Sequence, residues 1–267
     1  MLAPTKVALS TQVALSLVDL GDRRSRDVLV LLFGLGDSWR SYEAVLPYLP
    51  SSIRTIAISQ RGHGDSDKPQ THYSIRDFEA DLQGLLDALG VRRAVIAGHS
   101  SASIVARRFA LDHPERVAGL VLEGSFVNLA GVPDEVKAKF AALTDPIPRE
   151  FARDFNAGTF LHPPPASFVD AMVDESLKAP ARVWRESFAS LVEYDDARAL
   201  PALATPTLIV WGELDGIIDR RATEALARSI HFSKLLAYGN VGHTPHWEVP
   251  ERFARDVVAF IEQCRAP

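Results

Sequence analysis

The sequence predicts an α/β fold with a mostly parallel central sheet, flanking helices and an inserted helical lid. Short, nearly continuous apolar runs such as DVLVLLFG (27–34) are typical of strands that are buried on both faces. These runs alternate with helix-like segments, a pattern that favours parallel strands joined by helices on both faces of the sheet. Between residues 125 and 204 the alternation stops, and no buried-strand run interrupts a series of helix-like segments.

The first part of the predicted core covers residues 1–124. It opens with a hairpin, because TQVALSLVDLGD (11–22) alternates apolar and polar residues as a strand does. The segment 74–90 is a predicted helix that begins at an N-cap serine, Ser74, and stops at Gly90. The other expected elements are strands at 27–34, 53–59, 92–98 and 116–124, and helices at 38–49 and 101–113.

Residues 125–204 are expected to form the lid. Proline-rich breaks such as HPPPAS (162–167) separate four helix-like segments, at 134–144, 148–156, 166–178 and 181–194. An ordinary helical layer is the alternative, but the sheet pattern resumes directly afterwards, which favours an insertion. The second part of the core, 205–267, contains predicted strands at 206–213 and 233–239 and predicted helices at 220–230 and 251–263.

Composition narrows the class of protein. The 267 residues include 29 Lys and Arg against 34 Asp and Glu, a net charge of -5, and no basic block suggests a nucleic-acid partner. We expect no membrane span, because no uninterrupted apolar run reaches about 18 residues. The N-terminal segment lacks the features of a signal peptide, and the single cysteine, Cys264, fits a reducing compartment. A cytoplasmic protein is therefore expected, and no oligomeric state is predicted.

The segment AGHSSAS (97–103) is the strongest indication of chemistry. A strand that turns abruptly into a helix exposes its turn residue, Ser100, and the helix N-terminus offers N–H groups to an anion. Gly98 is small because strand and helix approach closely at such a turn. Ala102 stands where the usual G-x-S-x-G pattern has its second glycine, and we expect its methyl group to be tolerated. Ser100 is the predicted nucleophile.

A serine hydroxyl needs a base to act as a nucleophile. Of the eight histidines, His243 lies in GNVGHTPHWEVP, a loop between the last strand and the last helix that can reach back over the sheet edge. His246 in the same loop is the nearest rival. His99 is expected to pack, since side chains adjacent at such a turn diverge.

The base in turn needs an acid that fixes its tautomer. Asp215 in VWGELDGIID follows a buried strand, which places it on the same sheet edge as Ser100. The chain order Ser100, Asp215, His243 is the order that marks one serine-hydrolase fold. Glu123, at the end of a neighbouring strand, is the alternative acid, and Asp219 is expected to cap its helix.

Backbone N–H groups are expected to stabilise the oxyanion, one from Ser101 and one from Leu35 in the loop FGLGDSW. That loop begins like a dinucleotide-binding motif but has tryptophan at the third glycine position, so we predict no nucleotide cofactor. His243 and His246 lack further ligands nearby, and no metal is predicted.

Taken together, these segments resemble the lid-bearing serine α/β-hydrolases along essentially the whole chain. The matching segments are FGLGDSW, SQRGHGDSDKP, AGHSSAS, WGELD and GHTPHWEVPERFA. The resemblance implies a nucleophile at Ser100, a base at His243, an acid at Asp215, oxyanion donors at Leu35 and Ser101, and a structural role for SQRGHGDSDKP.

Three residues depart from the family pattern. Phe33 stands where most relatives have a histidine, Ala102 replaces a glycine, and Glu123 is an unusual acid at a strand end. Some relatives with a serine triad act as slow-turnover receptors for butenolide-like hormones, and their elbow also lacks the final glycine.

The resulting expectation is a hydrolase of small carboxylic esters or lactones that works through an acyl-enzyme. Its apolar pocket is expected to use aromatic residues, each of which also suits a core position: Phe33, Trp39, Phe126, Trp184 and Phe188. The alternatives are C–C bond hydrolysis, perhydrolysis or cofactor-free oxygen chemistry on the same scaffold, and a ligand-sensing receptor. A serine nucleophile disfavours haloalkane and epoxide chemistry, which need an aspartate.

Overall fold

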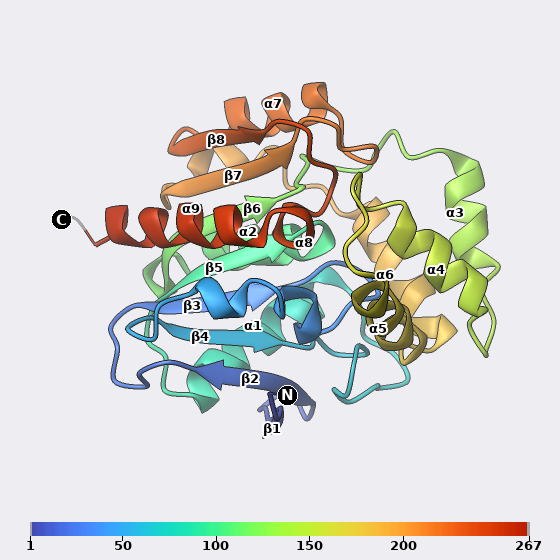
Figure 1. Cartoon of the computed structure of the whole chain (residues 1–267), viewed down its shortest axis with the longest axis horizontal. Helices are drawn as coiled ribbons and strands as arrows, with labels where there is room; N and C mark the ends of the chain where they lie inside the picture. Colours follow the sequence, from blue (N-terminus) through green and yellow to red (C-terminus); the bar gives the residue numbers. More distant parts are fainter. Residues whose placement is uncertain (1, 266–267) are drawn as a thin grey trace.

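An eight-stranded sheet forms the centre of the molecule in the computed structural model, which describes residues 2–265 (Figure 1). The strand order is β1-β2-β4-β3-β5-β6-β7-β8. Only the pairs β1–β2 and β2–β4 are antiparallel, so the predicted α/β fold with a mostly parallel sheet is confirmed. The strands are β1 (Thr5–Ala8), β2 (Ala14–Leu20), β3 (Val28–Leu32), β4 (Arg54–Ile58), β5 (Ala94–His99), β6 (Val117–Glu123), β7 (Thr207–Gly212) and β8 (Ser233–Tyr238).

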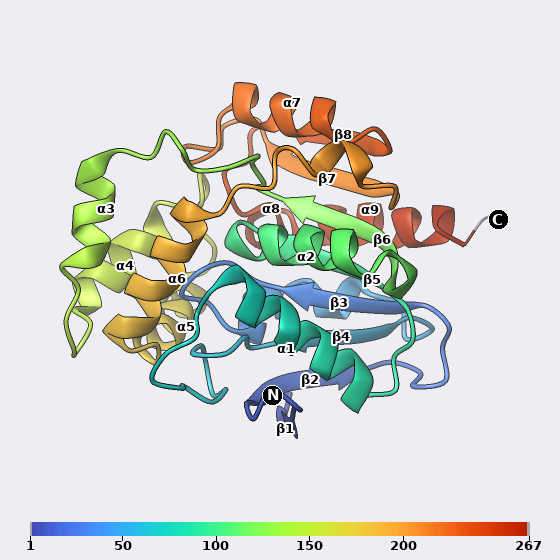
Figure 2. The same cartoon turned by 180° about the vertical axis from the view of Figure 1, so that it is seen from behind.

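Side chains of the buried strands alternate between two apolar layers. In β3, Val28 and Val30 belong to the core under α1 (Ile75–Ala88) and α2 (Ser101–Asp112). Leu29 and Leu31 belong to the core under α9 (Pro250–Gln263). Figure 1 shows α9 in front of the sheet, and Figure 2 shows α1 and α2 on the opposite face. Burial on both faces explains why these strands are continuous apolar runs.

The order of the strands creates a topological switch point at their carboxyl ends. The chain passes from β3 to β4 on one side and then returns to β5 on the other side of β3. The loops that follow β3 and β5 therefore diverge, and such a switch point is where open α/β sheets bind ligands. The loop FGLGDSW and Ser100 follow these two strands.

Local signals set the boundaries of α1 as predicted. Ser74 accepts a hydrogen bond from the backbone N–H of Asp77, and the Asp77 carboxylate accepts one from the Ser74 backbone, which completes a capping box. Gly90 follows the helix with a φ of 64°. Asp219 likewise caps α7 (Arg220–Ser229), as expected, by accepting from the N–H of Ala222.

The prediction of a helix over 38–49 is wrong. This segment forms two short 3-10 turns, η1 (Trp39–Tyr42) and η2 (Leu46–Tyr48). Pro47 has no N–H to donate, and its ring is incompatible with a preceding helical turn. The backbone N–H of Trp39 is also bound, to Ser59 Oγ at 3.2 Å.

Four helices lie between β6 and β7, grouped at one end of the sheet (Figure 1). They are α3 (Asp134–Ala141), α4 (Arg149–Ala157), α5 (Ala166–Leu177) and α6 (Ala181–Glu193). A proline occupies the N-cap position of each helix, which explains the proline-rich breaks. Whether this group acts as a lid stays a prediction.

No helix within residues 2–265 combines the length and the apolar character needed to cross a lipid bilayer.

Candidate active site

Ser100 occupies a strained turn between β5 and α2. Its φ of 50° and ψ of -122° are values that non-glycine residues rarely adopt. The backbone N–H of Ser100 donates to the carbonyl of Glu123 at 2.8 Å, and the Ser103 hydroxyl donates to the Ser100 carbonyl at 2.5 Å. Strain held in place by such bonds is typical of a nucleophile elbow.

Gly98 and Ala102 explain how strand and helix fit together at this elbow. A Cβ at Gly98 would lie 2.5 Å from the carbonyl oxygen of Ala102, which is backbone and cannot move aside. Ala102 itself is buried in the core under α1 and α2. Its methyl group therefore takes part in core packing, and only the first glycine of the elbow pattern is sterically required here.

His243 and Asp215 form a buried pair. His243 Nδ1 lies 2.7 Å from Asp215 Oδ2, and both side chains are almost inaccessible to solvent. The other carboxylate oxygen of Asp215 accepts the backbone N–H groups of Ile217 and Ile218, at 2.7 and 2.9 Å. These bonds orient the carboxylate toward the ring, which is what an acid that fixes a catalytic imidazole must do.

His99 and Gly124 support His243 from two sides. His99 Nε2 lies 3.1 Å from the His243 carbonyl, and the two rings are 4.8 Å apart. Burial lowers the pKa of His99 well below its ordinary value, so a neutral ring donates this bond. Gly124 has a φ of 54°, and a Cβ there would lie 2.7 Å from His243 Cε1. His99 therefore holds the backbone of the predicted base, and Gly124 leaves room for its ring.

The predicted oxyanion donors make no hydrogen bond within the part of the chain that the structure describes. Neither the backbone N–H of Leu35 nor that of Ser101 donates to another residue within 2–265. The Gln60 amide donates to the carbonyl of Phe33 at 3.0 Å and so supports the loop that follows β3. Sequence reasoning missed Gln60, although it lies just before the glycine-rich RGHG segment.

The five predicted pocket residues do not form one wall. Phe33 and Trp39 lie in the core under α9, whereas Phe126 and Trp184 lie in the core under α1 and α2. Trp184 also lies against Gly36, in the loop that carries the predicted oxyanion donor Leu35. Phe188 stacks on Phe140 of α3 with ring centroids 3.9 Å apart and lines a groove formed by α3 and α6, whose lining does not include Ser100.

Glu123, the alternative acid, is bonded to His246 instead of His243. Glu123 Oε1 lies 2.8 Å from His246 Nδ1 and 2.9 Å from the His246 backbone nitrogen. On the far side, His246 Nε2 lies 3.0 Å from Ser41 Oγ, which lies 3.0 Å from Asp37 Oδ2. The structure thus gives each histidine of the loop its own carboxylate. Ser41 was missed because no motif marks it, and Asp37 lies in FGLGDSW but was given no role.

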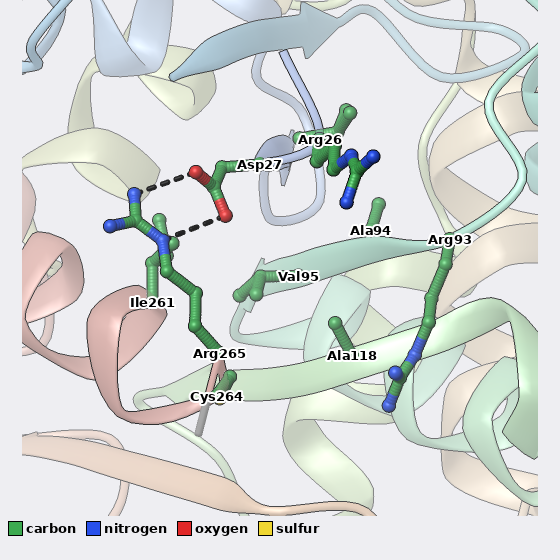
Figure 3. A pocket seen from close by; sticks show the side chains of 10 residues that line it. Arg26, Asp27, Arg93, Ala94, Val95, Ala118, Ile261, Cys264 and Arg265 are labelled. Atoms are coloured by element: carbon green, nitrogen blue, oxygen red, sulfur yellow. Dashed lines mark hydrogen bonds and ion pairs between the residues drawn. The ribbon is translucent and has the colours of Figure 1, made fainter. Parts of the chain in front are cut away.

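A pocket lies at the end of the sheet opposite to Ser100 (Figure 3). It has a volume of about 60 Å³ and lies at the amino ends of β3, β5 and β6, whereas Ser100 follows the carboxyl end of β5. Arg265 pairs there with Asp27 at 2.9 Å, and the exposed Arg26 and Arg93 stand further along the rim. Within residues 2–265 no group of three His, Cys, Asp or Glu side chains is arranged to hold a metal ion.

Comparisons with known proteins match this chain over most of its length. A family model described as the alpha/beta hydrolase fold matches residues 27–250. The 2-hydroxymuconate semialdehyde hydrolase of Pseudomonas sp. strain CF600 is 30% identical over 256 residues, covering 89% of this chain and 88% of that protein. The non-heme chloroperoxidase of Streptomyces lividans is 29% identical over 258 residues, covering 89% and 93%. A crystal structure of a hydrolase from Pseudomonas aeruginosa PA01 has a TM-score of 0.85 at 27% identity, covering 97% and 98%.

Proposed function

The chain belongs to the α/β-hydrolase fold family, and from that premise we propose that it hydrolyses small carboxylic esters or lactones with Ser100, His243 and Asp215 as its triad. A hydrolase-type enzyme follows from the fold and its relatives. The observation that carries the finer proposal is the buried 2.7 Å contact between His243 and Asp215, at the same sheet edge as the strained Ser100.

In the proposed acylation, His243 Nε2 takes the proton of the Ser100 hydroxyl as Oγ bonds to the substrate carbonyl carbon. Asp215 accepts from Nδ1–H and stabilises the imidazolium that forms. The N–H groups of Leu35 and Ser101 donate to the negatively charged oxygen. The alcohol then leaves with the proton from His243, and an acyl-enzyme remains.

Deacylation repeats these steps with water. His243 takes a proton from a water molecule, whose oxygen bonds to the acyl carbon. The bond to Ser100 Oγ breaks, Oγ receives the proton, and the carboxylic acid is released. For a lactone, the alcohol and the acid are parts of one product.

C–C bond hydrolysis is the second candidate. It is favoured by the similarity to a protein named 2-hydroxymuconate semialdehyde hydrolase. Such a reaction has a carbon leaving group, which must receive a proton before it departs. Similarity to a non-heme chloroperoxidase keeps perhydrolysis as a further alternative, in which peroxide takes the place of water. A slow-turnover ligand sensor would be acylated once and then stop.

The test is turnover of a panel of short p-nitrophenyl esters, lactones and a vinylogous β-diketone by wild type, Ser100→Ala and Ser52→Ala. Ser52 is an exposed serine just before β4 and serves as the matched control. We expect many turnovers of esters or lactones by wild type and Ser52→Ala, and none by Ser100→Ala. Turnover of the diketone alone would select the C–C reaction. A single turnover with labelling of Ser100 by a fluorophosphonate would select the sensor.

A further inference from the structure

Glu123 contacts both halves of the proposed catalytic apparatus. Its backbone carbonyl accepts the N–H of Ser100 at 2.8 Å. Its side-chain Oε1 lies 2.9 Å from the backbone nitrogen of His246 and 2.8 Å from His246 Nδ1. His246 is three residues after His243 in the same loop. One residue at the end of β6 therefore binds the nucleophile elbow with its main chain and the histidine loop with its side chain.

We propose that Glu123 is a positioning residue, which sets the separation of Ser100 and His243 by holding His246, and that it is not the acid of the triad. The proposal rests on the proposed function, because it presupposes that Ser100 and His243 react together. It assigns catalytic importance to two residues, Glu123 and His246, that do not contact Ser100 Oγ or the His243 ring through a hydrogen bond.

His246 is well suited to transmit this restraint because both of its ring nitrogens are engaged. Nδ1 faces Glu123, and Nε2 lies 3.0 Å from Ser41 Oγ. The indole N–H of Trp247 donates to the same Ser41 oxygen at 3.0 Å. His246 and Ser41 are fully buried. A rotation of the His246 ring would leave buried polar groups without partners, which is unfavourable by about 1–3 kcal/mol for each group.

The short connection from His246 back to His243 is stiff. α8 (Pro245–Glu248) begins at a proline, and the carbonyl of Thr244 accepts the N–H groups of Trp247 and Glu248. Glu248 Oε1 in turn accepts the N–H of Gly242 at 2.8 Å. The residues on both sides of His243 are thus fixed, so a displacement of His246 is expected to displace His243.

The distance between Ser100 and His243 is also restrained by a corner of the chain, at Gly124 just after β6. Gly124 donates its N–H to the carbonyl of Val210 in β7 at 3.0 Å, and its missing side chain leaves room for the His243 ring. His243 therefore packs on Gly124, while the backbone N–H of Ser100 is bonded to the carbonyl of Glu123. A tilt of this corner would change the distance between nucleophile and base, and a misplacement of about 1 Å can lower a rate roughly 100-fold.

Two features argue that the carboxyl of Glu123 acts as an acceptor and does not need its charge. Its only engaged oxygen is Oε1, whereas Oε2 is buried and has no partner among residues 2–265. Burial also raises the pKa of Glu123 to about 7. A glutamine can supply the same acceptor oxygen, but it cannot replace an acid that must stabilise an imidazolium. Glu123→Gln therefore separates the two roles.

The experiment compares Glu123→Gln and Glu123→Ala with Asp215→Asn in the full chain, on the ester or lactone that wild type turns over. We expect Glu123→Ala to lower kcat roughly 10- to 100-fold with KM within about twofold. Glu123→Gln should restore most of the lost kcat. Asp215→Asn should lose roughly 10³- to 10⁴-fold. A loss in Glu123→Gln as large as that in Asp215→Asn would overturn the proposal and make Glu123 a triad acid.

His246 provides a second pair of variants should Glu123→Ala fail to fold. Asparagine places its amide N–H near the position of Nδ1 and keeps the bond to Glu123, whereas glutamine places its amide near Nε2 and loses that bond. We expect His246→Asn to retain more kcat than His246→Gln. The double variant Glu123→Ala with His246→Gln should be no slower than the slower single variant, because both substitutions remove the same hydrogen bond between Glu123 and His246.

Multiplicative losses in this double variant, or a wild-type kcat in both Glu123→Ala and His246→Gln, would overturn the proposal. Failure of the proposed function has a different signature. In that case Ser100→Ala would keep its activity, or wild type would turn over no ester or lactone.

Discussion

The side chain of Trp184, from α6 of the inserted helices, lies directly against Gly36 in the loop that carries the predicted oxyanion donor Leu35. A Cβ placed on Gly36 would overlap the indole ring. Trp184 is fully buried and is surrounded by the rings of Phe140, Phe151 and Phe155, at centroid distances of 5.0–6.3 Å. The inserted helices therefore contact this loop through Trp184, whose position depends on the absence of a side chain at Gly36.

Gly36→Ala is expected to lower kcat/KM through this contact. The φ of Gly36 is 86°, which strains any residue with a side chain, and the new methyl group must displace either Trp184 or the loop. We expect a loss of roughly 10- to 100-fold. Steady-state kinetics on the best ester or lactone measures it. Gly131→Ala is the control, since nothing lies within 4 Å of a Cβ there. Wild-type kinetics in Gly36→Ala would show that the contact is not needed for activity.

Gly124→Ala is expected to act on His243. Its φ of 54° is strained for alanine, and the new Cβ would lie 2.7 Å from His243 Cε1. Gly90→Ala is a matched control, because Gly90 has a φ of 64° and open space around it, so that this variant reports strain alone. Both should lose about 1 kcal/mol of unfolding free energy from strain.

Only Gly124→Ala should also lose kcat, by roughly 10-fold or more. Urea unfolding and steady-state kinetics of the two variants measure the two effects separately. Equal kcat values in both would contradict the packing of His243 on residue 124.

Asp215→Asn is expected to inactivate the enzyme with little change in folding. The amide can keep the shape of the carboxylate, but it cannot stabilise a protonated His243. Asp219→Asn is the control, since asparagine is also a good N-cap for α7. We expect a kcat loss of roughly 10³- to 10⁴-fold in the first variant and nearly full activity in the second. Loss of activity in Asp219→Asn as well would point to damage of the whole 215–219 turn.

The sequence is most informative where one local pattern decides the outcome. The continuous apolar run of β3 follows from burial on both faces, and Ser74 and Gly90 mark the ends of α1 because capping is a local property. The segment 38–49 has helical spacing, but Pro47 and the bond from Trp39 to Ser59 override it.

The contacts among the supporting residues of the candidate site escape sequence reasoning for a related reason. Glu123 and His246 are 123 residues apart, and Ser41 and His246 are 205 apart. The sequence singles out Glu123 and His246 separately, as an alternative acid and an alternative base, but only the fold reveals that they are partners. The pairing of His243 with Asp215 could be foreseen because the order of strands brings both segments to one sheet edge.

The carboxyl of Asp37 is expected to make stability depend on pH. Burial raises its pKa from 3.8 to about 7; the bond with Ser41 opposes this rise, and the charge of Glu175 adds to it. Burial lowers the pKa of His246 well below its ordinary value. A protonated Asp37 can donate to Ser41, which leaves the Ser41 hydroxyl free to donate to neutral His246. In the native state Asp37 therefore keeps its proton up to about pH 7, whereas in the unfolded chain it loses that proton above about pH 4.

A carboxyl with a raised pKa in the native state stabilises the fold below its unfolded pKa and loses that contribution as pH rises toward the native pKa. Between about pH 4 and pH 7, Asp37 should therefore lower the unfolding free energy by up to about 1.4 kcal/mol per pH unit. Asp37→Asn resembles the protonated form and should remove this slope. Glu123 contributes with the same sign, and His63, whose pKa burial lowers to about 4, with the opposite sign, so only the difference between variants is diagnostic.

Urea unfolding at pH 5, 6 and 7 measures this difference. Asp134→Asn is the control, because that exposed carboxyl has a pKa lowered by its bond to Lys137 and does not titrate in this range. We expect the stability of wild type and Asp134→Asn to follow one pH dependence, and that of Asp37→Asn to fall less steeply or to rise. Parallel curves for all three proteins would mean that Asp37 is ionised in the native state, and that Ser41 donates to Asp37 and not to His246.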